Sequence, residues 1–81
     1  MWKLVLHNDD YTTQEFVVWV LVRVFRKPEA EATRIMLDVH RQGKGVAGIF
    51  TKDVAETKIN QVRQLAEAQE FPLLCTVEPE A

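Results

Sequence analysis

The chain has 81 residues, a formal net charge of −2 and 47% hydrophobic residues, which fits one small globular domain and argues against disorder. Its Lys and Arg side chains are scattered and form no basic stripe, which argues against nucleic acid as a partner. The apolar run 16–22 is far shorter than the roughly 20 residues that a membrane span needs, no secretory leader is recognisable, and a lone cysteine, Cys75, fits a reducing compartment. We therefore expect a soluble cytoplasmic protein without a membrane partner.

A short strand, predicted over Lys3–His7, opens the chain. A helix is predicted over 13–25, because the T-x-x-E sequence at 12–15 fits a capping box, in which each side chain satisfies a free backbone N–H of the first turn. Its many β-branched residues would also suit a strand, but the length and the cap favour a helix. The helix is more apolar than one buried face requires, so we expect Trp19 or Val22 to be exposed.

A second helix is predicted to have Pro28 in its first turn and to end in a left-handed turn at Gly43. Its core face follows helical spacing: Ala32, Ile35, Met36 and Val39. The remaining elements are a strand, a helix capped by Thr51 and a last strand, expected over 45–50, 52–70 and 73–77. This β-α-α-β-α-β order predicts an α+β fold, a three-stranded antiparallel sheet packed against three helices, as a single domain over 1–81.

Small polar acceptors stand in a row where the first strand meets the first helix: Asn8, Asp9 and Asp10. Asn and Asp bond their own backbone in turns and favour helix starts, so a purely local role is one interpretation. Two adjacent carboxylates exceed what one cap needs, so a cation-binding role is the other. Such a corner, set on an apolar wall, could hold a ligand with an ammonium group at one end and a hydrophobic group at the other.

His40 follows Met36 by four residues, so the two side chains share one helix face with one polar and one apolar end. The alternative is a half-buried histidine that is favoured near a helix C-terminus. No nucleophile with a nearby base, no glycine-rich phosphate loop and no familiar set of metal ligands is present. We therefore expect neither an enzyme nor a metal or other cofactor, and Cys75 is interpreted as a small core residue.

At this point the sequence resembles the ClpS family, the bacterial adaptors of the N-degron pathway. The runs that carry the resemblance are spread over nearly the whole chain: KLVLHNDDYT at 3–12, IMLDVHRQGKG at 35–45, FTKDVAETK at 50–58 and PLLCT at 72–76. Several motifs in the same order are far more specific than any one of them alone. ClpS proteins bind the N-terminal residue of proteins marked for degradation and deliver them to the ClpA unfoldase of the ClpAP protease.

The resemblance implies three groups of site residues. The α-amino group and first peptide unit of the substrate would be held by Asn8, Asp9, Asp10 and His40. The side-chain pocket would be lined by Thr12, Gln14, Val17, Met36, Val39 and Leu73. The unfoldase would dock on the face that carries Asp53, Glu56 and Lys58, a set of charges that on its own is typical of a solvated helix face. The expected N-terminal residues are Leu, Phe, Trp and Tyr, and the expected state is a monomer.

Two departures from the family pattern matter. Gln14 stands where the family usually has a methionine that gates the pocket, which leaves open whether Tyr and Trp are favoured or the substrate range is narrowed. Family members also carry a flexible N-terminal extension used in delivery, and almost nothing precedes the first strand here, so the resemblance implies good degron binding with poor delivery. The same fold class includes the C-terminal domain of the ribosomal stalk protein. A translation-associated or structural interaction domain without a degron pocket is therefore the alternative function.

Overall fold

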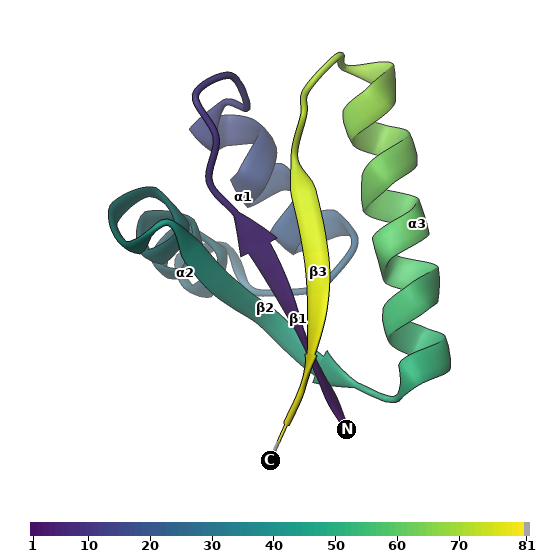
Figure 1. Cartoon of the computed structure of the whole chain (residues 1–81). Helices are drawn as coiled ribbons and strands as arrows, with labels where there is room; N and C mark the ends of the chain where they lie inside the picture. The colour runs from purple at the N-terminus through teal and green to yellow at the C-terminus, as the bar shows by residue number, and fades with distance from the viewer. Residues whose placement is uncertain (81) are drawn as a thin grey trace.

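The computed structural model describes residues 1–80 and has the predicted order of elements, β-α-α-β-α-β (Figure 1). Their bounds are β1 Trp2–His7, α1 Gln14–Arg23, α2 Glu29–Gln42, β2 Lys44–Phe50, α3 Lys52–Ala68 and β3 Leu74–Pro79. The strands form one antiparallel sheet in the order β2-β1-β3. The first strand is therefore central, and the predicted fold class is confirmed.

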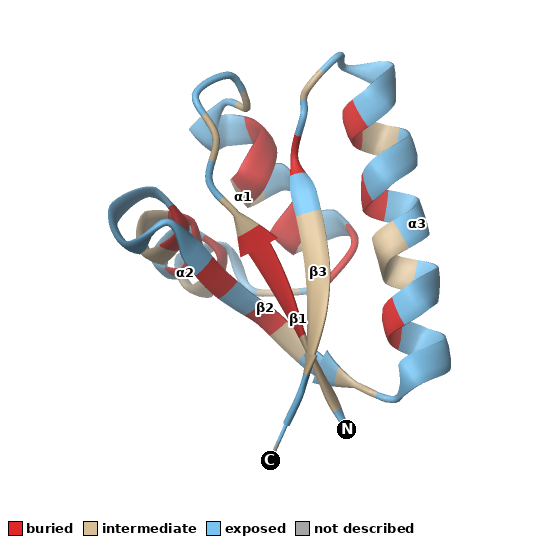
Figure 2. Ribbon diagram, in the orientation of Figure 1, coloured by how far each residue is buried: buried red, intermediate tan, exposed pale blue. Residues whose placement is uncertain are grey.

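The core lies between the sheet and the helices. Leu4 and Leu6 alternate with Val5 along β1 and are fully buried against the helices, together with Val20 and Leu21 of α1. Figure 2 shows that the buried positions of each helix lie on the side turned toward the sheet. A strand places alternate side chains on opposite faces, so the helix-covered face of β1 supplies the centre of the core.

Helix α1 begins differently from the prediction. The capping box at 12–15 is wrong, because Thr13 is the N-cap and its hydroxyl accepts a hydrogen bond from the backbone N–H of Phe16 at 3.1 Å. The Thr12 hydroxyl instead donates a hydrogen bond to the Asp9 carboxylate at 2.7 Å. A bond to an ionised acceptor is stronger than a bond between neutral groups. The helix ends at Arg23, two residues earlier than expected. The expected exposure is confirmed for Trp19, whose exposed fraction is 40%.

Helix α2 matches its predicted face and end. It begins at Glu29, so Pro28 precedes the first turn instead of lying in it. All four predicted core residues are buried: Ala32, Ile35, Met36 and Val39. Gly43 follows the helix with φ of 90°, the left-handed region that costs glycine little, and its N–H donates to the Val39 carbonyl at 3.0 Å. This turn leads directly into β2.

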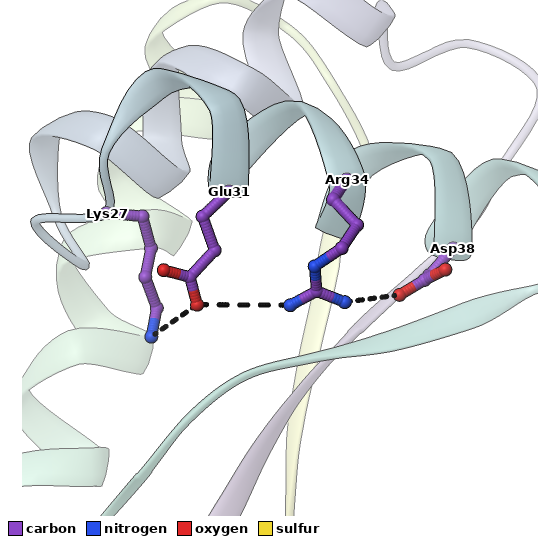
Figure 3. A network of polar contacts seen from close by, with 4 residues as sticks. All are labelled: Lys27, Glu31, Arg34 and Asp38. Carbon is purple, nitrogen blue, oxygen red and sulfur yellow. Dashed lines mark hydrogen bonds and ion pairs between the residues drawn. The ribbon is translucent and has the colours of Figure 1, made fainter.

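A ladder of charges that neutralise one another runs from Lys27, just before α2, along the polar face of that helix (Figure 3). Lys27 lies 3.7 Å from Glu31, Glu31 lies 3.9 Å from Arg34, and Arg34 lies 3.2 Å from Asp38. The ladder forms one wall of an open hollow of about 620 Å³ between α2 and β2. Exposed pairs of this kind contribute about 0–1 kcal/mol each. We interpret the ladder as a solvated wall, since its charges already have partners.

Three details of the C-terminal part differ from the prediction. Thr51 stands at the N-cap of α3, but its side chain makes no capping hydrogen bond. The helix ends at Ala68 instead of 70, because Glu70 adopts a positive φ of 60° and the Phe71 N–H turns back to the Ala66 carbonyl at 2.8 Å. The last strand consequently begins one residue later than expected and extends to Pro79.

Lys58 connects α3 to the end of α1. Its ammonium donates a hydrogen bond to the Val24 carbonyl at 2.8 Å, and Val24 is the C-cap of α1. The same ammonium lies 5.7 Å from the ring centroid of Phe25 and 5.5 Å from that of Phe50. A cation at this place satisfies a helix-terminal carbonyl and is attracted to two aromatic faces.

We predict that Lys58→Met lowers the free energy of unfolding by about 2 kcal/mol, because it removes a charged hydrogen-bond donor and its cation–π contacts but keeps the apolar stem. Urea unfolding followed by circular dichroism measures the change. Lys52→Met, at the exposed start of the same helix, is the matched control and leaves the midpoint almost unchanged. Equal urea midpoints for the two variants would contradict a stabilising contact between Lys58 and the end of α1.

Candidate functional site

The corner after β1 is braced by one carboxylate. Asp9 Oδ1 accepts hydrogen bonds from the backbone N–H groups of Tyr11 and Thr12 at 2.8 and 2.7 Å, and Oδ2 accepts the Thr12 hydroxyl at 2.7 Å. Burial alone raises the pKa of the Asp9 carboxyl, but the hydrogen bonds from Thr12 and Tyr11 outweigh it, and the pKa lies below its ordinary value. A carboxylate offers about four acceptor positions, so Asp9 both shapes the corner and keeps capacity for one more donor.

The pairing of β1 with β2 brings the corner to the end of α2, because His7 lies opposite Lys44, and one further backbone hydrogen bond extends this pairing. The Asn8 N–H donates to the Gly43 carbonyl at 2.9 Å. Strand pairing and this bond place Asn8 next to the C-terminal end of α2, where His40 lies one turn after Met36. Side chains of the corner and of α2 consequently face one common space.

That space is an open hollow of about 460 Å³, here called the corner pocket. It is lined by residues 8–15 together with Val17, Met36, Val39 and His40. Its apolar wall is rigid, because Val17, Met36 and Val39 belong to the hydrophobic core and are each less than a tenth exposed. Its polar rim is accessible, since Asn8, Asp10 and His40 are all exposed. The pocket therefore offers hydrogen-bond acceptors beside an apolar surface.

Most predicted site residues meet in the corner pocket. The four expected amine-binding residues line it, as do five of the six expected side-chain contacts: Thr12, Gln14, Val17, Met36 and Val39. Leu73 is not among the lining residues; it lies just before β3 and is buried in the same core as Val17, Met36 and Val39. His40 is exposed, not half-buried as the alternative interpretation expected.

Sequence reasoning left out Tyr11, Thr13 and Glu15, which also line the pocket. Tyr11 is 77% exposed, an unusual position for an aromatic side chain directly after two acids. In the sequence, the position of Tyr11 directly after Asp9 and Asp10 was the only sign that it belongs to the site. Tyr11 adds an exposed aromatic ring to the rim.

The expected docking residues lie apart from this pocket, on α3. Asp53 and Glu56 are exposed, whereas the Lys58 ammonium is engaged by the Val24 carbonyl. A shallow hollow of about 230 Å³ lies on the same face and includes Val54, whose exposed fraction is 44%. The face therefore combines charge with an exposed aliphatic residue.

Other chemistry is limited in the described part of the chain. Burial raises the pKa of the Cys75 thiol to about 12, so the thiol stays protonated at neutral pH and is a poor nucleophile. Within residues 1–80, no three His, Cys, Asp or Glu side chains gather as a possible metal site. None of the helices in that range is long and apolar enough to cross a bilayer.

A family model described as "ATP-dependent Clp protease adaptor protein ClpS" matches residues 1–76. The chain belongs to the ClpS family. It is 64% identical over 80 residues to the ATP-dependent Clp protease adapter protein ClpS of Desulfatibacillum aliphaticivorans, covering 99% of this chain and 77% of that protein. The ClpS of Acetivibrio thermocellus is 58% identical over 80 residues, with 99% and 81% covered.

A solved ClpS structure superimposes closely on the fold. Agrobacterium tumefaciens ClpS2 bound to L-phenylalaninamide matches with a TM-score of 0.93 and 44% identity, and the match covers 98% of this chain and 95% of that one. The ClpS-like arrangement of strands and helices predicted from the sequence is thereby confirmed. The family is one of protease adaptors.

The lowered pKa of Asp9 gives a pH prediction with a definite sign. A carboxyl whose folded pKa lies below its value of 3.8 stabilises the fold above that pH, and the stabilisation is lost as the pH falls through the folded pKa. Asp9→Asn keeps the shape but removes the charge, so we expect it to be less stable than wild type at pH 7. We expect the difference to shrink below pH 3.8.

Urea unfolding of both proteins between pH 7 and pH 2.5 measures this difference. Glu67→Gln, an exposed carboxylate on α3, is the control for a general loss of charge. A constant difference in the free energy of unfolding between wild type and Asp9→Asn over the whole pH range would contradict a stabilising role of the Asp9 charge.

Proposed function

We propose that this chain is a non-enzymatic adaptor that recognises N-degron substrates by a free α-amino group and a bulky hydrophobic first residue, and delivers them to the ClpA unfoldase of ClpAP. The observation that carries the proposal is the corner pocket, where exposed acceptors adjoin an apolar wall. The ClpS2 relative is described with L-phenylalaninamide bound, a molecule with an ammonium group and a benzyl side chain. Both halves of such a ligand suit the pocket.

The ammonium group is assigned to the polar rim. A free α-amino group has a pKa of about 7.7–8.0 and is largely cationic at neutral pH. The carboxylate of Asp10, the amide oxygen of Asn8 and the remaining acceptor position of Asp9 are suited to its three N–H donors, and such charge-assisted bonds are the stronger kind. His40 is assigned to the first peptide unit.

The first side chain is assigned to the apolar wall of Val17, Met36 and Val39. Fully burying a Leu or Phe side chain contributes about 1.5–3 kcal/mol. An internal residue of the same type has a peptide bond in place of the free ammonium group, so it would leave the rim acceptors unpaired. The chain that precedes it would also need space at the rim. Rejection through unpaired polar groups is stronger than rejection by apolar shape. The combination selects chain ends with Leu, Phe, Trp or Tyr.

Delivery is assigned to the face of α3 that carries Asp53, Glu56 and Lys58. Support comes from its exposed charges and the exposed Val54 beside them. The face lies outside the pocket lining, so substrate and unfoldase would not compete for the same residues. We assign the activity to a cytoplasmic monomer, a single domain over 1–81 without a cofactor.

The first test compares a short peptide with N-terminal Phe and its acetylated form by fluorescence anisotropy. We expect binding of the free peptide only, and weaker binding as the pH rises above about 8, because the amine loses its charge. Asp10→Ala and His40→Ala each weaken binding about ten-fold or more, the loss expected for a hydrogen bond to a charged group. Glu67→Ala is the matched control. Equal affinity for both peptides would refute the adaptor and favour an interaction domain without a degron pocket.

The second test concerns the substrate range. Gln14 lines the corner pocket with an amide that can bond a phenol or an indole. We expect wild type to prefer Tyr and Trp over Leu more strongly than Gln14→Met does, by about three-fold to ten-fold, the effect of one neutral hydrogen bond. Competition among peptides that start with Leu, Phe, Tyr, Trp or Ile measures the ranking. Identical rankings for both proteins would remove Gln14 from selectivity.

A further inference from the structure

A second groove adjoins the corner pocket on the outside of the molecule. This outer groove is an open hollow of about 440 Å³ between α1 and α2, and its apolar lining consists of Val18, Trp19, Val22 and Met36. Gln14, Glu15 and Met36 line the corner pocket and the outer groove alike. The two hollows are therefore neighbours that share one wall of side chains.

Trp19 gives the outer groove a rigid side. Its ring stacks on Phe16 with centroids 5.9 Å apart and planes 23° apart, and the Arg23 guanidinium lies 5.6 Å from the ring centroid. The ring is nevertheless 40% exposed. An exposed aromatic side chain that its neighbours already hold in place loses little freedom on binding, and such side chains are enriched among residues that dominate binding energy.

The spacing of the two hollows fits an extended peptide. In an extended chain, side chains of residues one and three point to the same face and lie about 6.6 Å apart along the backbone. The corner pocket and the outer groove are direct neighbours, because Gln14, Glu15 and Met36 line both of them. A first side chain in the corner pocket would bring the third side chain over Val22 and Trp19.

We propose that the outer groove is a second substrate subsite, which selects an apolar side chain at the third residue of the bound chain end. The proposal rests on the proposed function and deepens it. The carboxylates of Glu15 and Glu29 lie at the rim of the groove, so an acidic third residue is disfavoured by charge repulsion and desolvation. The preferred substrates thus carry a bulky hydrophobic first residue and an aliphatic or aromatic third residue.

The experiment uses labelled peptides that share one Gly-Ser tail and begin Phe-Gly-Leu, Phe-Gly-Gly, Phe-Gly-Glu or Phe-Leu-Gly. Anisotropy titrations give their dissociation constants with wild type and with two groove variants, Trp19→Ala and the milder Val22→Ser. We expect Phe-Gly-Leu to bind wild type about five-fold more tightly than Phe-Gly-Gly, since an open groove covers about half of a Leu side chain. Phe-Gly-Glu binds most weakly, and Phe-Leu-Gly gains less than Phe-Gly-Leu.

We expect both groove variants to lower the five-fold ratio between the affinities for Phe-Gly-Leu and Phe-Gly-Gly toward one. Val46→Ala, which trims a similarly exposed apolar residue on β2, is the matched control and keeps the wild-type ratio. Thermal melts verify that each variant is folded, and Val22→Ser carries the test if Trp19→Ala unfolds. The ratio, not the absolute affinity, is the readout, because a general loss of stability lowers the affinity for all peptides together.

Binding of all four peptides with equal affinity would overturn the subsite and leave the proposed function intact. Failure of every peptide to bind would overturn the proposed function and the subsite with it. An unchanged ratio in Trp19→Ala and Val22→Ser, accompanied by loss of self-association or of binding to the unfoldase, would assign the groove to a protein partner and overturn the substrate assignment.

Discussion

The site depends on the antiparallel pairing of β1 with β2, which the hydrogen bond from the Asn8 N–H to the Gly43 carbonyl extends to the end of α2. Gly43 can offer that carbonyl because its φ of 90° turns the chain sharply at the end of α2. Without this pairing, the acidic corner and the last turn of α2 would be two separate surface features. With it, residues 8–10 lie opposite Met36 and His40, and one pocket acquires both polar and apolar walls.

Much of the fold was predictable because local signals agree with it. The left-handed turn at Gly43 and the apolar face of α2 follow from rules that act within a few residues. The helix cap was not predictable from spacing, because Thr12 and Thr13 are both suitable and only the position of the Asp9 carboxylate decides between them. The end of α3 was not predictable either, because Glu70 takes a left-handed conformation that Gly or Asn usually adopts.

The candidate site was predictable only in part. Adjacent acceptors at 8–10 are visible in the sequence, but spacing alone could not join them to His40, about thirty residues away, and the resemblance to the family supplied that link. For Leu73 and Lys58 the structure adds packing that spacing cannot give. The first lies in the core and the second ends on the Val24 carbonyl, and both placements depend on how distant elements pack together.

The rigid wall and open mouth of the corner pocket also have a kinetic consequence. For the proposed contact, about one residue deep, we take a dissociation constant of about 1 μM, and a preformed site permits association at about 10⁶ M⁻¹s⁻¹. The product of the two is a dissociation rate of about one per second. A captured chain end thus stays long enough to be presented and leaves soon enough to be taken over, a lifetime that suits a carrier whose task ends at transfer.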